Sequence, residues 1–89
     1  MRIQHLDAPN RCTPAGEFKD NTFTITMEMT ARELQDLISA CNWQETGMQA
    51  DIDSGKFDQE PGTKEAWKQT VERAKNRKNV LSVIAQVIF

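Results

Sequence analysis

Apolar and polar residues alternate strictly along residues 22–29, TFTITMEM. One face of an extended chain here would carry the four apolar residues of the segment: Phe23, Ile25, Met27 and Met29. A period of two with β-branched residues predicts a β-strand whose polar face meets water. Residues 1–6, MRIQHL, are a candidate for a short first strand, and residues 7–21 carry the Pro, Gly, Asn and Asp residues typical of loops.

The pattern changes at Thr30, where we expect a helix to begin. Thr30 and Glu33 have the spacing of a capping box, in which each side chain accepts the other's backbone N–H. Apolar residues then recur at mostly helical spacing: Leu34, Leu37, Ile38, Cys41, Met48 and Ile52. This spacing predicts a first helix over residues 31–54, closed by Ser54-Gly55. Gly47 offers an earlier bend or end, since glycine costs about 1 kcal/mol in a helix interior.

A second helix is expected over residues 63–89, after a connection at 55–62, with Thr63 as its cap. Its apolar residues again follow helical steps: Trp67, Val71, Ala74, Leu81, Ile84 and Ile88. The tail at 80–89, VLSVIAQVIF, is apolar almost all round. It is compatible with a buried helix or a buried strand, and the unbroken heptad phase favours the helix.

The expected fold class is α+β, with an N-terminal strand or β-hairpin followed by a long antiparallel helical hairpin (ββαα). One domain would span residues 1–89, with strands and loop in 1–29. A short connection between two helices predicts antiparallel packing. With its centre near residue 58, Arg77 would face Ala40, and Trp67 would lie between Met48 and Ile52.

A helical hairpin with one or two strands cannot cover all the apolar surface of the second helix. Soluble monomers usually avoid exposing such a patch. The sequence therefore predicts a homo-oligomer that completes the fold. The expected interface residues are Val80, Val83, Ile84, Val87 and Phe89.

The composition of the 89 residues is ordinary, with 38% hydrophobic and 27% charged residues. It excludes collagen-like, low-complexity and wholly disordered chains. No apolar run reaches the ~18 residues of a membrane span. The first 22 residues lack the apolar core of a secretory signal, so we expect a cytoplasmic location with reduced thiols at Cys12 and Cys41.

Residue types that carry catalysis or bind metals are sparse. His5 is the sole histidine, there is no tyrosine, and no hydrolase, zinc-protease or phosphate-loop motif occurs. Cys12 and Cys41 do not form the close pairs of a zinc site. Asp51-x-Asp53 resembles part of a calcium loop, but the distal glutamate is misplaced and Lys56 intrudes. The sequence thus predicts no enzyme, no metal and no cofactor.

Charge is distributed unevenly along the chain. Residues 1–63 carry five basic and eleven acidic residues, whereas residues 64–89 carry six basic and two acidic ones. The net charge of −2 makes duplex DNA an unfavourable partner. In the expected hairpin the basic stretch faces Trp43, which could stack a base while cations hold phosphates. The candidate ligand-binding residues are Trp43, Arg73, Lys75, Arg77 and Lys78. The alternative is a solvated basic face that pairs with Glu45 and its neighbours.

The segment TFTITMEMTARELQDLI, continuing through the second helix, resembles small accessory proteins of tailed bacteriophages. The shared features are a Thr-rich strand, a helix opening T-x-x-E-L-x-x-L and a helical hairpin. This resemblance implies a non-enzymatic oligomer that acts by binding. We expect its target to be a host protein in the host cytoplasm, and the charge of the acidic segment 45–60 makes that segment a candidate contact surface. Some phage proteins of this kind sequester cyclic-nucleotide immune signals, so an anti-defence sponge is the alternative. An assembly protein without a ligand is the third expectation.

Overall fold

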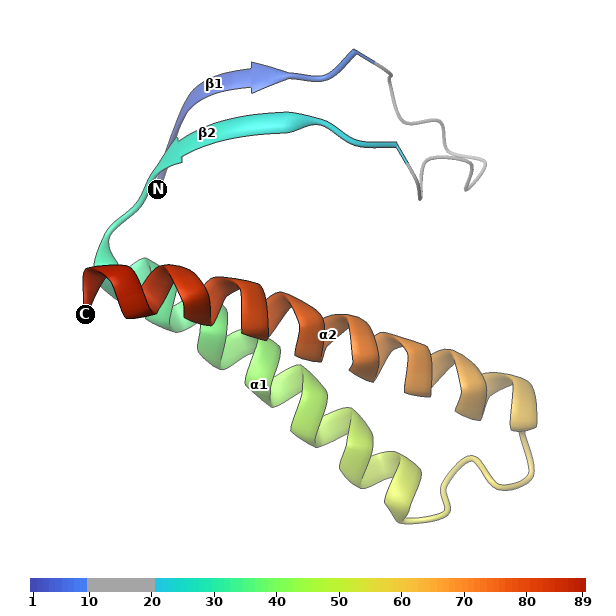
Figure 1. Ribbon diagram of the computed structural model, residues 1–89. Helices are drawn as coiled ribbons and strands as arrows, with labels where there is room; N and C mark the ends of the chain where they lie inside the picture. The colour runs from blue at the N-terminus through green and yellow to red at the C-terminus, as the bar shows by residue number, and fades with distance from the viewer. Residues whose placement is uncertain (10–20) are drawn as a thin grey trace. The chain divides into compact units, whose positions relative to one another are not determined.

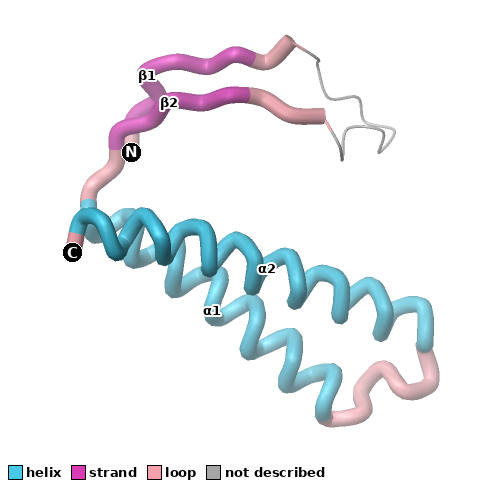
Figure 2. The backbone as a smooth tube through the Cα atoms, in the orientation of Figure 1, coloured by secondary structure: helices cyan, strands magenta, loops and turns pink. Residues whose placement is uncertain are grey.

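The computed structural model describes residues 1–9 and 21–89. Figures 1 and 2 show the order β1 (Arg2–Asp7), β2 (Thr24–Glu28), α1 (Ala31–Asp53) and α2 (Pro61–Ile88). The predicted ββαα arrangement is thus confirmed. The chain divides into two compact units, Met1–Thr30 and Ala31–Phe89. Cys12 and most of the predicted loop lie outside the described residues.

The first unit is an antiparallel β-hairpin with a bulge that decides which side chains share a face. Ile3 pairs with Met27. Leu6 pairs with Ile25. Because Ile3 and Leu6 are three residues apart, a regular strand would place them on opposite faces. The register shifts just after Ile3, which leaves Gln4 as the extra residue of a β-bulge and returns Leu6 to the face of Ile3.

The hairpin therefore has one polar and one apolar face. On the polar face, Arg2 Nη2 donates to Glu28 Oε2 at 2.6 Å across the two strands. The large side chains of the apolar face are only partly covered, with exposed fractions of 39–58%: Ile3, Leu6, Phe23 and Ile25. This face therefore has apolar surface available for a further contact. Such a contact would stabilise the hairpin, because a two-stranded sheet is marginally stable by itself.

Helix α1 begins at Ala31, as the capping pattern predicts, and passes through Gly47 without interruption. A Cβ added at Gly47 would meet nothing within 4 Å, so no neighbour requires glycine there. Near the end of the helix, the Ser54 amide donates to the Ala50 carbonyl at 2.9 Å. Gly55 then has a φ of 81°, a left-handed conformation that glycine adopts at low cost.

Helix α2 begins at Pro61, two residues before the predicted start at Thr63. Proline suits the first turn of a helix, because its missing N–H would have no intrahelical partner there. The cap residue Glu60 makes no side-chain cap bond. The helix continues through Ile88, so the apolar tail is helical, as the heptad phase predicts.

The two helices run antiparallel (Figures 1 and 2), and a cluster of buried residues lies beside their connection. Ile52, Phe57 and Val71 are buried there, with Met48 and Trp67 packed against them. The rings of Phe57 and Trp67 lie 4.6 Å apart between centroids, at an interplanar angle of 43°. Trp67 thus lies among the residues predicted for it, whereas Phe57 comes from the connection and has no periodic signal in the sequence.

The pairing of the helices is offset from the predicted register. Arg77 Nη2 donates to Gln44 Oε1 at 2.7 Å, whereas the prediction placed Arg77 opposite Ala40. The offset is about one helical turn. Its physical cause is the connection, because residues 54–59 form turns and place the Phe57 side chain in the core. The midpoint of the hairpin therefore lies later in the chain than residue 58.

Candidate interaction surface

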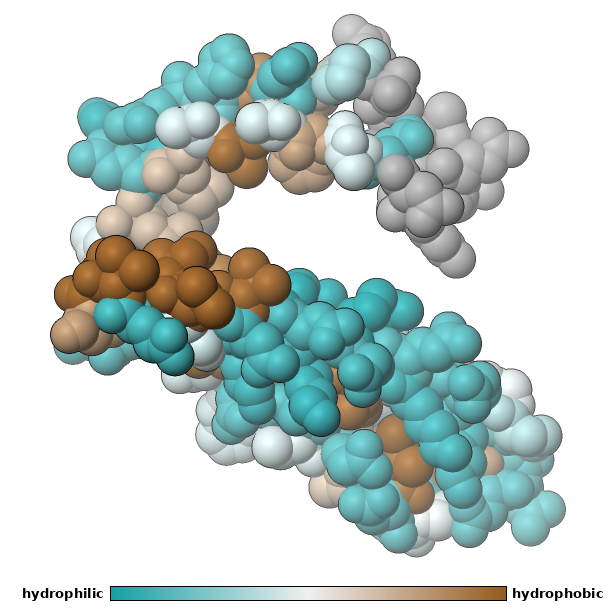
Figure 3. Space-filling model, viewed as in Figure 1, coloured by the Kyte–Doolittle hydropathy of each residue, from teal (hydrophilic) through white to brown (hydrophobic). Residues whose placement is uncertain are grey.

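The last third of α2 carries most of the large exposed apolar side chains of the helical unit. These side chains are 47–82% exposed: Val80, Val83, Ile84, Val87, Ile88 and Phe89. Figure 3 shows them as a continuous hydrophobic area near the C-terminal end of α2. We call these six residues the α2 patch.

The helical positions of these residues explain why they are exposed. Ala74 is fully buried, and Leu81 and Ala85 continue its row along the side of α2 that faces α1. Val83 and Val87 lie on the far side of the same helix, because each residue turns the helix by about 100°. The tail is apolar on both sides, so one side packs against α1 and the other meets solvent.

All five residues predicted for an oligomer interface lie on the α2 patch. The sixth member, Ile88, belongs with Ile84 to the apolar residues whose spacing predicts the second helix, and it is 54% exposed. Ile88 lies in the last turn, where the neighbouring residues Ala85 and Phe89 line a hollow with Gln35 and Asp36 from the start of α1. A single neighbouring helix covers this end incompletely. The use of the patch as an interface stays a prediction.

Two of the predicted ligand-binding cations contact α1 instead of standing free. Lys78 Nζ forms an ion pair with Glu45 and lies 3.4 Å from Asn42 Oδ1. Both side chains of the ion pair are mostly covered, with 25% and 20% exposed. Arg77 bonds Gln44, as described above. These contacts match the alternative in which the basic stretch pairs with Glu45 and its neighbours.

Trp43 lies apart from these contacts. Its side chain is 77% exposed, the largest exposed aromatic surface among the described residues. Two residues along a helix correspond to about 200° of rotation, so Trp43 and Glu45 lie on different sides of α1. Because Lys78 reaches Glu45, the structure does not bring Trp43 and Lys78 together around one hollow.

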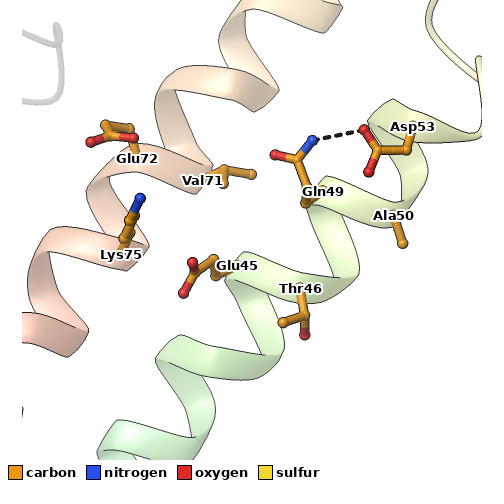
Figure 4. Close-up of a pocket in the computed structure, with 8 residues that line it drawn as sticks. All are labelled: Glu45, Thr46, Gln49, Ala50, Asp53, Val71, Glu72 and Lys75. Atoms are coloured by element: carbon orange, nitrogen blue, oxygen red, sulfur yellow. Dashed lines mark hydrogen bonds between the residues drawn. The ribbon is translucent and has the colours of Figure 1, made fainter.

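The two remaining candidates, Arg73 and Lys75, differ in their surroundings. Arg73 Nη2 donates to the Thr70 hydroxyl on its own helix at 2.8 Å. Lys75 lines a hollow of about 370 Å³ between the helices (Figure 4). Its lining residues are Glu45, Thr46, Gln49, Ala50, Asp53, Val71, Glu72 and Lys75.

The charge of this hollow opposes phosphate binding. Three carboxylates, from Glu45, Asp53 and Glu72, line it with a single ammonium group. One of the carboxylates accepts a hydrogen bond from Gln49 Nε2 at 2.9 Å, drawn as the dashed line in Figure 4. The negative balance repels an anion and makes the hollow a poor site for a nucleotide.

Within the described residues, no three His, Cys, Asp or Glu side chains are placed to hold a metal ion. His5 lies in β1 opposite Thr26, and Cys41 carries a half-buried free thiol on α1. In the same part of the chain, neither helix contains a stretch long and apolar enough to cross a membrane.

No protein-family model, curated protein or solved structure matches the chain.

Proposed function

We propose that this protein is a small non-enzymatic binding protein that assembles as a homo-oligomer and acts on another protein. The observation that carries the proposal is the α2 patch, with its six apolar side chains on one end of one helix. Contiguous apolar surface of this kind marks protein-interaction sites in soluble proteins. The β-hairpin of the first unit, Met1–Thr30, supports the same proposal, because its apolar face is also partly uncovered.

Light scattering on the purified chain tests the assembly. The chain has a mass of 10.1 kDa, and we expect a measured mass that is a multiple of this value. Val83→Glu places a charge in the α2 patch and should lower the mass to that of one chain. Gln69→Glu, at an exposed position of α2 about three turns before the α2 patch, is the matched control and should leave the mass unchanged. A wild-type mass of 10.1 kDa at micromolar concentration would contradict the proposal.

The proposed target is a protein of the host cell, met in its cytoplasm, in line with the resemblance to phage accessory proteins. The acidic segment offers a second surface for it. Asp51 is half-buried, whereas Asp53, Asp58 and Glu60 are exposed. A pull-down from host lysate with wild type, with Val83→Glu and with a triple Asp53→Asn, Asp58→Asn, Glu60→Gln variant would show which surface retains the target. Equal capture of the target by all three proteins would contradict a role for either surface.

Sequestration of a cyclic nucleotide has weaker support. Lys78 and Arg77 are engaged with α1, and Trp43 lies on another side of that helix. Calorimetry with cyclic di- and trinucleotides tests this alternative. Binding heat that disappears in an Arg73→Gln, Lys75→Gln variant would favour it over protein binding.

A further inference from the structure

We infer that two copies of the chain pair antiparallel through the outer side of α2, with Val80 of each copy beside Val83 of the other. This inference rests on the proposed function and specifies its first partner, a second copy of the chain. It also specifies the direction and register of the contact, which the assembly proposal leaves open.

The spacing of the outer residues provides the first argument. Asn76, Val80, Val83 and Val87 follow one another at steps of four, three and four, and all are exposed. We call them the outer row. Alternating steps of three and four form the seam along which two helices interdigitate. The outer row lies away from α1, so a second helix can approach it without disturbing the packing of α1 against α2.

The shape of the outer row provides the second argument. A hollow of about 340 Å³ is lined by Asn76, Arg77, Val80 and Leu81. When Val80 of each copy lies beside Val83 of the other, antiparallel geometry brings Val87 opposite Asn76. Val87 is the most exposed member of the α2 patch, at 82%. Its side chain would enter the hollow of the other copy, and the same contact would repeat across the two-fold axis.

Charge selects the antiparallel direction. Arg73 and Arg77 lie at the N-terminal side of the outer row, whereas the last turn of α2 has no basic residue. A helix C-terminus carries partial negative charge and is stabilised by nearby cations. Antiparallel pairing places Arg73 of one copy beside the last turn of the other, while Arg77 keeps its hydrogen bond to Gln44. Parallel pairing would instead place Arg73 beside Arg73 and bring like charges together.

Disulfide cross-linking distinguishes the two directions. The experiment uses the full chain with its own cysteines replaced by Cys12→Ser and Cys41→Ala, and with either Asn76→Cys or Val87→Cys added. Both added positions are exposed, so neither variant should lose its fold. In the antiparallel pair, position 76 of one copy lies roughly 16 Å along the axis from position 76 of the other, at 1.5 Å per residue. The same separation holds between the two copies of position 87. A disulfide needs Cα atoms within about 7 Å.

We expect oxidation of a mixture of the two variants to give a covalent dimer that joins one copy of each, and either variant alone to remain largely uncross-linked. Glu65→Cys, mixed with either variant, is the control and should form no dimer, because position 65 lies about 16 Å or more along the axis from positions 76 and 87 of the other copy. Efficient cross-linking of each variant with itself would show parallel pairing and overturn the inference. Absence of every cross-link, in a protein that light scattering shows to be dimeric, would overturn the inference while leaving the assembly proposal standing. A monomeric mass would overturn both.

Discussion

Two glycines of the helical unit have different backbone conformations and different surroundings. Gly47 has ordinary helical geometry with open space around it, so the structure gives no reason for glycine there. Gly55 has a φ of 81°, and a Cβ added to it would lie 2.9 Å from Asp58 Oδ2. The first glycine weakens a helix, and the second allows the helix to end.

The same substitution at the two positions should therefore change stability in opposite directions. Gly47→Ala should raise the free energy of unfolding by up to about 1 kcal/mol, because alanine is favoured in a helix interior. Gly55→Ala should lower it by about 1–2 kcal/mol, the cost of a left-handed conformation with a Cβ. Urea titration followed by circular dichroism measures both changes. Changes of equal sign would show that one of the two backbone conformations is misassigned.

Phe57 is the residue whose importance is least visible in the sequence. It is 6% exposed and contacts the ring of Trp67, although it lies in the connection between the helices. Phe57→Ala should destabilise the protein by about 3 kcal/mol, at the lower end for buried phenylalanines because a connection can partly collapse around the cavity. Gln59→Ala, at an exposed position of the same connection, is the control and should change the unfolding midpoint only slightly. Equal effects of the two changes would place Phe57 outside the core.

At the scale of the elements, polar contacts join α1 and α2 in the alignment that the connection sets. The ion pair between Lys78 and Glu45 joins the two helices near their middle, and Arg77 bonds Gln44 beside it. Shifting one helix by a turn would separate both pairs. Apolar side chains allow several alignments, whereas a partly buried ion pair has one favourable geometry.

A double-mutant cycle with Lys78→Met and Glu45→Gln tests this contact. Methionine keeps much of the lysine stem, so the cycle isolates the charge interaction. We expect a coupling free energy of about 1 kcal/mol, at the upper end for pairs near the surface. The coupling should fall at high salt, because ions screen it. A coupling near zero at low salt would mean that the ion pair adds nothing to the alignment that the connection sets.

At the scale of the whole molecule, the described residues of each unit bury little apolar surface. Among the described residues, the buried apolar side chains are Leu34, Ile52, Phe57, Val71 and Ala74. A chain of this size is only marginally stable unless a further contact is added. Association of two chains through the α2 patch would add such a contact.

If assembly stabilises the fold, thermal stability should depend on protein concentration. The melting temperature of the wild type should rise with concentration, because mass action favours the folded oligomer. Val83→Glu should lower the melting temperature and remove its dependence on concentration. Calorimetry at several concentrations measures both effects. A wild-type melting temperature independent of concentration would indicate that one copy is sufficient for stability.

The sequence by itself determined the type and order of the elements. Alternation around Ile25 and Met27 predicts a strand, and steps of three and four around Leu34 and Val71 predict helices. These patterns are local, because a strand or helix repeats its geometry every few residues. The start of the second helix was predicted two residues too late, because α2 begins at Pro61 and not at Thr63.

Only the tertiary structure decided the alignment of these elements. The bulge at Gln4 and the burial of Phe57 depend on contacts with residues distant in the sequence, and neither interrupts a local pattern. The alignment of α1 with α2 follows from the path of the connection, which moved the partner of Arg77 by one turn. The predicted ligand-binding cations depended on that alignment. A one-turn offset pairs Lys78 with Glu45, because side-chain neighbours across two helices are set by register and not by composition.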